Sequence, residues 1–358
     1  MTYLDANATE PLRPSARTAA LAALDMVGNP SSIHTAGRAT RRLLEAARED
    51  IASRYGAEPA QVVFTSGGTE ANALAIAGLG QGRRRILGAT EHDAVRAAAG
   101  PDALTIPVDR NGVINLATLA EVLRGTPALV CLMLANNETG TLQPIAEVAA
   151  LCHRAGALLH VDAVQAAGRM RVNLGELGAD SLALSGHKIG GPPGAGALLL
   201  TPGQALGALI TGGGQERGRR GGTPALPAIA GFAAAARELP RDLSALRDCA
   251  ERHAVAAGAV PLATGATRLG NTASLALPGI RADTQVIALD LAGIAVSAGA
   301  ACSSGKVGRS HVLDAMGLGP LASETIRVSL PWNVTEADID AFAAAYAAMA
   351  GRLARRAA

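Results

Sequence analysis

The chain has 358 residues, of which 49% are hydrophobic, 17% are charged and only 2% are aromatic. This length exceeds one ordinary domain and predicts one large and one smaller domain, with cores built from Ala, Leu, Val and Ile. The formal net charge is +2, and charges of both signs are spread along the chain. This balance argues against a nucleic-acid partner and against binding to an anionic membrane.

The start of the chain and its cysteines indicate where the protein works. Residues Met1–Asp5 lack the basic residues and the apolar stretch of a signal peptide. No apolar run approaches the roughly 18 residues needed to cross a bilayer. The four cysteines, Cys131, Cys152, Cys249 and Cys302, show neither CxxC pairing nor metal-ligand spacing. We therefore expect a cytoplasmic protein without a disulfide framework and without a metal site.

The middle of the chain alternates short apolar runs with helical patterns, which is typical of a mostly parallel sheet covered by helices on both faces. A strand is expected at Gln61–Phe64, followed by a Gly-rich turn at 65–69 and a helix at Glu70–Gly78. A further helix is expected at Ile145–Ala155. The other expected strands are Ile86–Gly88, Ala128–Leu134, Leu158–Val161, Ser181–Leu184 and Gly196–Leu200.

After about residue 240 the strands become shorter, and we expect a smaller α/β domain there. Its expected elements are a helix at Asp242–Ala257, strands near Ala273–Leu277 and Ala295–Ser297, a Gly/Ser-rich loop at Ala298–Arg309, a strand at Thr325–Leu330 and a helix at Glu336–Ala357. We assign residues 14–244 to the large domain. The small domain then comprises residues 1–13 and 245–358.

Polar residues follow several of the expected strands, at the sheet edge where ligands collect in parallel α/β sheets. Lys188 ends the segment Ser185-Gly186-His187-Lys188 and is a candidate Schiff-base former for pyridoxal phosphate (PLP). A lone lysine in such a place is more often a surface residue. Asp162, after the preceding strand, suits a protonated pyridine nitrogen and would make the ring an electron sink, although a helix cap or a surface charge is the alternative.

Three further residues fit the same ring. Gln165 lies three residues after Asp162, and Asn137 ends a neighbouring strand, so either side chain could reach the ring hydroxyl. His92 ends another strand and could stack on the ring, although a single histidine in this place is more often structural.

The phosphate of such a cofactor needs backbone N–H groups, and a Gly-rich turn offers them. Ser66-Gly67-Gly68-Thr69-Glu70 lies between a strand and a helix, where close backbone approach and the helix dipole both favour an anion. Thr69, Ser185 and His187 could add side-chain donors. A second Gly-rich and basic stretch at 212–223 is either a flexible surface loop or an anion-facing loop.

These motifs together resemble the class V aminotransferase family, and most closely its cysteine desulfurases of the NifS/IscS type. The resemblance runs nearly end to end. Its segments are Tyr3–Thr9, Gly28–His34, Phe64–Glu70, Glu91-His92, Asn136–Gly140, His160–Gln165, Ser185–Pro192, the GGGQERGxRxGT pattern at 212–223, and Ser297–Gly305. Such a resemblance implies the PLP-dependent transferase fold of type I.

The resemblance also implies roles for individual residues. Lys188 would bind PLP, His92 would stack on the ring, Asp162 would contact the pyridine nitrogen, and Asn137 and Gln165 would lie near the ring oxygen. Gly68, Thr69, Ser185 and His187 would hold the phosphate. The threonine that matches Thr223 reaches the phosphate of the other subunit, which implies a homodimer. Arg327, with Asn137, would bind the substrate carboxylate through its guanidinium fork.

Cys302 separates a desulfurase from its relatives. Glycine and serine on both sides suggest an exposed loop, which suits a thiol that visits the cofactor and leaves carrying sulfur. Cys131, Cys152 and Cys249 fit buried small hydrophobes better. The implied reaction converts L-cysteine to L-alanine with a persulfide on Cys302. Lys188 would remove the α-proton, and His92 would move a proton during sulfur transfer.

The sulfur would then pass to an acceptor such as an iron–sulfur scaffold protein, and the resemblance allows an iron–sulfur contact through Cys302. Two alternatives remain open from the sequence. One is another PLP enzyme of this family, such as a selenocysteine lyase or an aminotransferase. The other is a binding protein that has lost activity. The chain also departs from the family pattern at Ala6, Asn136, Thr139 and Pro331, and Pro331 stands where glycine is usual.

Overall fold

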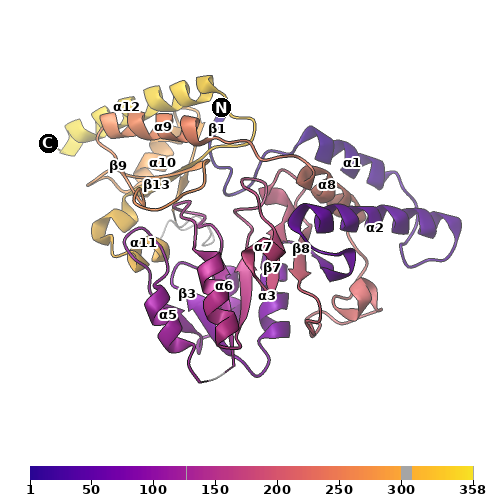
Figure 1. Ribbon diagram of the computed structural model, residues 1–358. Coiled ribbons are helices and arrows are strands. Elements are labelled where there is room, and N and C mark those ends of the chain that lie inside the picture. Colours follow the sequence, from indigo (N-terminus) through magenta and orange to yellow (C-terminus); the bar gives the residue numbers. More distant parts are fainter. Residues whose placement is uncertain (126, 300–308, 358) are drawn as a thin grey trace.

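The computed structural model describes residues 1–125, 127–299 and 309–357, and it contains two bodies that differ in size (Figure 1). The larger body is built around a seven-stranded sheet with the strand order β2-β8-β7-β6-β5-β3-β4. Its strands are β2 (Val62–Thr65), β3 (Arg84–Gly88), β4 (Leu104–Ile106), β5 (Ala128–Met133), β6 (Leu158–Asp162), β7 (Ser181–Ser185) and β8 (Gly196–Leu200).

The sheet is mostly parallel, as the sequence predicts. Strands β7, β6, β5, β3 and β4 run parallel to one another, whereas β8 is antiparallel to both β7 and β2. The reversal follows from the short connection between β7 and β8, which holds only a 3₁₀ turn at Gly186–Lys188. A parallel neighbour would need a crossover of a dozen or more residues.

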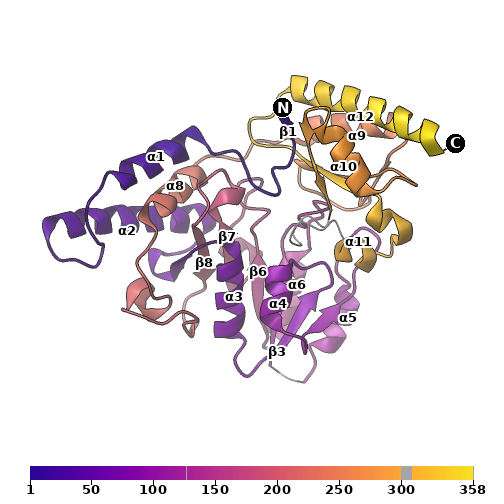
Figure 2. The same ribbon diagram turned by 180° about the vertical axis from the view of Figure 1, so that it is seen from behind.

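Helices cover both faces of this sheet, and alternate strand residues face opposite cores. On β5, Val130 and Leu132 belong to one core while Leu129 and Cys131 belong to the other. The second core is closed by α3 (Gly68–Leu79) and α4 (Asp93–Ala99), which Figure 2 shows in front of the sheet. The first core is closed by α1 (Pro14–Leu24), α2 (Thr35–Tyr55), α5 (Leu116–Val122), α6 (Ile145–Arg154), α7 (Leu174–Leu177) and α8 (Leu226–Ala236).

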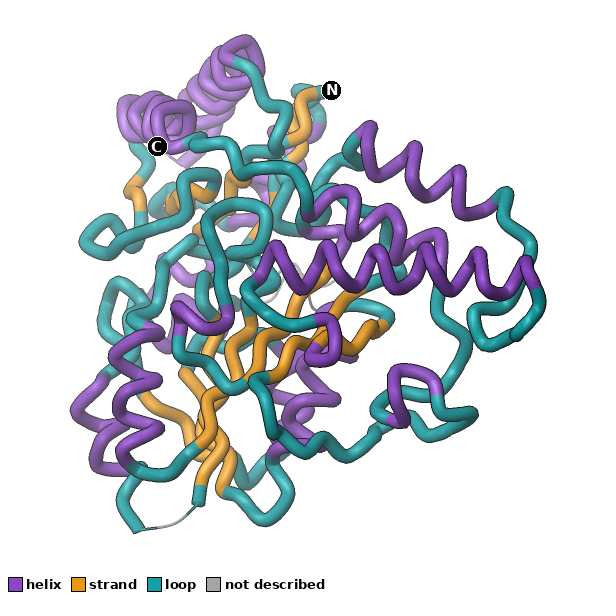
Figure 3. The backbone as a smooth tube through the Cα atoms, turned by 45° about the vertical axis from the view of Figure 1, so that its right-hand side comes forward, coloured by secondary structure: helices purple, strands orange, loops and turns teal. Residues whose placement is uncertain are grey.

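The smaller body contains a four-stranded sheet of order β12-β13-β10-β9 and a two-stranded pair of β1 with β11. The strands are β1 (Thr2–Tyr3), β9 (Val260–Pro261), β10 (Thr272–Ala276), β11 (Ile294–Ala295), β12 (Ser297–Ala298) and β13 (Thr325–Ser329). The helices are α9 (Ser244–Ala256), α10 (Ala282–Asp290), α11 (His311–Ala315) and α12 (Glu336–Ala357). Figure 3 shows α9 and α12 side by side at the outer edge.

The N-terminal segment joins the two bodies. Leu4 is buried in the core of the smaller body, and its backbone N–H donates to Ala295. A few residues later, the N–H groups of Glu10 and Arg13 donate to the carbonyl groups of His187 and Gly190 in the larger body. Residues 1–13 therefore run from the smaller body to the turn that carries Lys188. The proposed domain boundaries at 13/14 and 244/245 stay a prediction.

The strands differ from the sequence-based expectations in several places. The expected strand at Ala295–Ser297 is two short strands, because β11 pairs with β1 whereas β12 pairs with β13. Strand β4 was not expected, because it has three residues and two of them are exposed. Strands β1 and β9, of two residues each, were not expected either, whereas the other strands and the final helix lie within two residues of the predicted bounds.

Candidate active site

A cavity of about 160 Å³ lies at the carboxyl ends of β5, β6 and β7, where the fold collects ligands. Nine of the ten residues expected to hold a cofactor line it, although they come from five separate stretches of the chain. They are Gly68, Thr69, His92, Asn137, Asp162, Gln165, Ser185, His187 and Lys188. Their individual roles stay predictions, but the structure brings the whole set together.

Lys188 reaches the cavity from the 3₁₀ turn that follows β7. Its ammonium nitrogen Nζ donates a hydrogen bond to the backbone carbonyl oxygen of Asn7 over 2.5 Å. Gly186 permits the turn, because a Cβ there would lie 3.0 Å from the carbonyl oxygen of Ala195 and 3.1 Å from Phe232 of α8. The small residues before the lysine therefore serve close helix–sheet packing, and this packing directs the amine at the cavity.

Asp162 is the buried anion of the cavity. Its carboxylate accepts hydrogen bonds from Asn72 Nδ2 at 2.7 Å and from the N–H of Val164 at 2.9 Å. Burial raises the pKa of Asp162, while the hydrogen bonds and the nearby His92 and Lys188 act to lower it. A buried carboxylate held by donors on one side suits a cationic partner on the other.

Asn72 is a cavity residue that the sequence analysis missed. Its Oδ1 lies 2.9 Å from Nε2 of His160, whose Nδ1 lies 2.8 Å from the hydroxyl of Ser181. Burial lowers the pKa of His160 to about 3, so its ring is neutral at physiological pH. His160 precedes Asp162 by two positions, and alternate residues of a strand face the same side. That spacing was the only signal in the sequence for this relay.

The turn before α3 forms a cradle that suits a phosphate. A Cβ on Gly68 would lie 2.6 Å from Val164 Cγ2, so no other residue fits there without displacing its neighbours. The first N–H groups of a helix have no partner within the helix and point toward the cavity end. Ser185 and Thr69 line the same end of the cavity.

His187 and His92 line the cavity from two different elements, the 3₁₀ turn after β7 and the start of α4. His187 Nδ1 lies 3.2 Å from Thr9 Oγ1, and burial together with the charge of Lys188 lowers the pKa of His187 to about 4. His92 is the N-cap of α4, and its Nδ1 accepts a hydrogen bond from the N–H of Ala94 at 3.0 Å. This acceptor role places the proton of the neutral His92 ring on Nε2.

Three predicted residues are not part of the cavity lining. Arg327 is buried behind it, donating to the carbonyl oxygen of Asn137 at 3.1 Å and to Asp5 Oδ1 at 2.7 Å. Thr223 is exposed at the end of the Gly-rich stretch. Cys302 lies outside the described residues.

The described residues that flank the Cys302 segment converge on one carboxyl group. Ser310 Oγ donates to Glu138 Oε2 over 2.6 Å, and a Cβ on Gly299 would lie 2.5 Å from the same oxygen. Glu138 follows the cavity residue Asn137 directly in the chain. Burial is the main cause that raises the pKa of Glu138 to about 7.

The remaining cysteines do not approach the cavity lining. Cys131 and Cys152 are buried, and burial raises the pKa of the Cys152 thiol to about 12. Cys249 is only half-buried, so it fits the expectation of a buried small hydrophobe less well. Within the part of the chain that the structure describes, no group of three His, Cys, Asp or Glu side chains could hold a metal ion.

The donor set of the cavity fits PLP. An amine, a buried carboxylate and a helix N-terminus with a glycine at closest approach are the three groups that an aldehyde, a pyridine nitrogen and a phosphate require. All three are present around one cavity, on Lys188, Asp162 and Gly68.

Comparisons with known proteins agree with this set of groups around the cavity. The profile of the family described as Aminotransferase class-V matches residues 2–342. A cysteine desulfurase of Cereibacter sphaeroides is 44% identical, over 94% of this chain and 92% of the relative. The solved structure of a NifS-like protein from Rickettsia africae is 33% identical with a TM-score of 0.89, covering 98% of this chain and 99% of the other.

A third similar structure contains a bound amino acid. The structure of SspA in complex with cysteine is 30% identical with a TM-score of 0.84, covering 94% of this chain and 100% of the other. Across the described residues, no helix is long and apolar enough to span a membrane.

Proposed function

Because this chain belongs to the class-V aminotransferase family and matches its cysteine desulfurases over nearly its whole length, we propose that it is a PLP-dependent enzyme that converts L-cysteine to L-alanine. The observation that carries the proposal is the meeting of Lys188 and Asp162 at one cavity, next to the glycine cradle before α3. Fold likeness alone would support less, because one fold serves many reactions.

PLP, when bound, supplies a ring that withdraws electrons from the substrate carbon atom. Asp162 would hold the ring nitrogen in its protonated form, and Asn72 would hold Asp162. Gly68, Thr69, Ser185 and a neutral His187 would bind the phosphate. His92 would cover the ring face, with the proton on its Nε2 atom available for transfer.

Lys188 would move the α-proton of the substrate. When the amine is not attached to the cofactor, the carbonyl oxygen of Asn7 would hold it at the edge of the cavity, and the 2.5 Å hydrogen bond between the two supports this role. A lysine held in this way stays within reach of the substrate carbon. Arg327 and Asn137 would bind the substrate carboxylate, with Arg327 approaching from behind Asn137.

Cys302 would take the sulfur as a thiolate. Its sulfur bonds to the substrate sulfur, the substrate carbon–sulfur bond breaks, and the carbon takes a proton. L-Cysteine and the Cys302 thiol thus become L-alanine and a Cys302 persulfide, with all atoms accounted for. The persulfide sulfur would pass to an acceptor such as an iron–sulfur scaffold protein or another thio-cofactor pathway in the cytoplasm.

A homodimer is part of the proposal. Large apolar side chains are exposed on α1, on the loop that follows it and beside the Gly-rich stretch. Leu24, Val27 and Ile33 are 65%, 86% and 90% exposed, and Leu209 and Ile210 are 49% and 42% exposed. Contiguous exposed apolar groups mark interaction surfaces. From the family resemblance we infer that Thr223 of a second copy would reach the phosphate end of this cavity.

The test is turnover of L-cysteine by the PLP-loaded protein, with alanine and sulfide measured together in the presence of a thiol reductant. We expect equal amounts of both products from the wild type. Lys188→Ala should give neither product and no stable visible band with PLP. A keto acid that retains the sulfur in place of alanine, or turnover of selenocysteine alone, would replace the desulfurase assignment by one of the two rival activities.

A further inference from the structure

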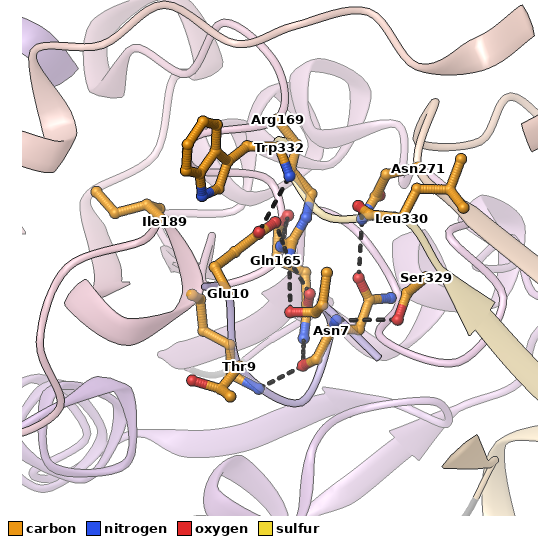
Figure 4. A network of polar contacts seen from close by, with 12 residues as sticks. Asn7, Thr9, Glu10, Gln165, Arg169, Ile189, Asn271, Ser329, Leu330 and Trp332 are labelled. Atoms are coloured by element: carbon orange, nitrogen blue, oxygen red, sulfur yellow. Dashed lines mark hydrogen bonds and ion pairs between the residues drawn. The ribbon is translucent and has the colours of Figure 1, made fainter. Parts of the chain in front are cut away.

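A buried network of polar side chains connects the cavity with the smaller body, and Figure 4 shows it around Asn7, Gln165 and Arg169. Arg169 donates from one terminal nitrogen to both the backbone oxygen and the side-chain Oε1 of Gln165, each at 2.8 Å. Its other terminal nitrogen donates to the carbonyl oxygen of Ala6 at 3.1 Å. The side chain of Arg169 is only 6% exposed.

The contact between Arg169 and Gln165 decides how the amide of Gln165 is oriented. A guanidinium group carries hydrogen-bond donors and no acceptor, so only the oxygen of the amide can face it. The amide nitrogen must then face the other way. It does, because Gln165 Nε2 donates to the carbonyl oxygen of Asn7 over 3.0 Å. The same carbonyl oxygen accepts the hydrogen bond from Lys188 Nζ.

Gln165 therefore presents an NH₂ group, with a second hydrogen to donate, on the side of the cavity where Lys188 lies. Without Arg169 the amide could rotate and present its oxygen instead, since the two ends are similar in size and shape. A donor and an acceptor at this place have opposite effects on an anionic ring oxygen beside the lysine.

Arg169 is itself held in place by Glu10 of the N-terminal segment. Their charged groups lie 3.4 Å apart, and both side chains are 6% exposed. Glu10 Oε2 also accepts a hydrogen bond from the N–H of Trp332 at 3.3 Å. Burial raises the pKa of Glu10, and the charge of Arg169 acts against that rise.

We propose that Arg169 is a positioning residue that fixes the amide of Gln165 with its NH₂ group toward the cofactor, and that Glu10 keeps Arg169 in this position. The inference rests on the proposed function, because it assumes that PLP occupies the cavity. It adds two residues that act through Gln165, and it connects the cavity with Trp332 of the smaller body.

The test is a pH titration of the visible absorbance band of the PLP-loaded protein. A donor to the ring oxygen stabilises its negative charge and so weakens the hold on the proton at the neighbouring lysine nitrogen. Arg169→Met should therefore raise the pH midpoint of the band by about 0.5 unit or more. Arg171→Met is the matched control, because Arg171 pairs with Glu176 at the surface, and it should titrate as the wild type.

The same substitution made in the Gln165→Ala variant distinguishes an effect of the orientation of the Gln165 amide from a direct effect of the Arg169 charge. Arg169 is a cation near the cavity, and its charge already contributes to the lowered pKa of His187. A direct charge effect would persist after Gln165→Ala, whereas an effect through the amide would disappear. We expect Gln165→Ala/Arg169→Met to have the same midpoint as Gln165→Ala alone. Equal shifts in both backgrounds, or a wild-type midpoint for Arg169→Met, would overturn the proposal.

Removal of Arg169 alone leaves a buried carboxyl group without its cation, so the variant could fail to fold. Glu10→Gln/Arg169→Met removes both charges and keeps an acceptor for the Trp332 N–H. The pH midpoint of the visible band of this double variant should lie above that of Glu10→Gln, by the same amount as Arg169→Met lies above the wild type. A double variant with the midpoint of Glu10→Gln would overturn the proposal. If PLP does not bind, the wild type shows no visible band, and the proposed function and the inference fail together. If only the inference fails, the wild-type band is intact.

Discussion

Asn72 Nδ2 lies 2.7 Å from Asp162 Oδ2, and the oxygen of the same amide is held by the neutral ring of His160 at 2.9 Å. The two contacts together fix the amide of Asn72 with its donor toward the carboxylate. Ser181 bonds the far nitrogen of the His160 ring, so the relay ends within β7. The side-chain hydrogen bond to Asp162 thus depends on Asn72 of α3 and on His160 of β6, which holds the amide of Asn72.

The first prediction concerns this relay. Asn72→Ala leaves Asp162 with only the hydrogen bond from Val164, and the pKa of the buried carboxyl group should rise further. A hydrogen bond to a charged group contributes about 1.5–3 kcal/mol, so kcat/KM for L-cysteine should fall roughly 10- to 100-fold. Ser181→Ala, at the far end of the relay, should have a much smaller effect. Steady-state kinetics check this, and wild-type kcat/KM for Asn72→Ala would refute it.

The second prediction concerns Glu138 and pH. The pKa of Glu138 lies at about 7, above its ordinary value of 4.5, mainly because the group is buried. Ser310, Arg327 and His92 act to lower this pKa, and Asp93 acts to raise it. A carboxyl group whose pKa is raised by folding stabilises the fold below its ordinary pKa. That contribution is lost as the pH rises from 4.5 to about 7.

Glu138→Gln removes the titration and keeps an acceptor for Ser310. The free energy of unfolding of the variant, relative to the wild type, should therefore increase between about pH 5 and pH 7 and stay constant above. The full difference is at most about 3 kcal/mol. Denaturant unfolding at fixed protein and cofactor concentrations measures it. Parallel pH profiles for the two proteins would show that Glu138 does not titrate in this range.

The third prediction concerns the Gly-rich stretch at 212–223. Arg48 contacts both carboxylate oxygens of Glu216, at 2.6 and 2.8 Å, and both side chains are at most 5% exposed. Glu216 also accepts from the N–H of Phe64 in β2, although its own φ of 48° lies in the left-handed region. This ion pair therefore holds a strained segment against the sheet edge.

Arg48→Met would leave the Glu216 carboxylate buried without its cation, at a cost of about 3–5 kcal/mol of folding free energy. Arg171→Met, which breaks a surface pair, should leave the free energy of unfolding unchanged. Chemical denaturation of both variants compares the two sites. If the two variants unfold at the same denaturant concentration as the wild type, the buried pair does not hold the stretch.

The fourth prediction concerns Arg327. Within the described residues, Nε of this buried guanidinium has no hydrogen-bond partner, although both terminal nitrogens do. Arg327→Lys removes the planar fork, and kcat/KM for L-cysteine should fall about 10- to 100-fold through a higher KM. The visible band of the bound cofactor should be retained. Asp5→Asn, which keeps the guanidinium, is the control and should lower kcat/KM less. An unchanged KM for Arg327→Lys would exclude Arg327 from substrate binding.

Much of the fold could be predicted because β5 and β8 carry continuous apolar runs and β7 has an apolar centre, and all three are buried along their whole length. The direction of β8 could not be predicted, since a short apolar run reads the same in a parallel and an antiparallel strand. Lys188 and Asp162 were visible as strand-end polar residues. The Cys302 segment is outside the described residues, so that prediction rests on the motif.

Asn7, Asn72 and Arg169 could not be found in the same way. Asn72 lies inside a helix, Arg169 lies in the turns after β6, and Asn7 lies in the N-terminal segment, so no strand end marks them. Asn72 contacts His160, which is 88 positions away, and Asn7 contacts Gln165, which is 158 positions away. Arg169 lies only four positions after Gln165, but the Glu10 carboxylate that holds it is 159 positions away. Such roles follow from tertiary contact, which spacing along the chain does not encode.

The central claim is that Lys188 and Cys302 together remove sulfur from L-cysteine. The most direct measurement is intact-mass and peptide-mass analysis of the PLP-loaded protein after L-cysteine is added without a reductant, with alanine measured in the same sample. We predict one added sulfur atom on Cys302 and one alanine released per active site, and neither in Cys302→Ala, although that variant keeps the cofactor band. Alanine release by Cys302→Ala at the wild-type rate, or alanine without added sulfur on Cys302, would contradict the account.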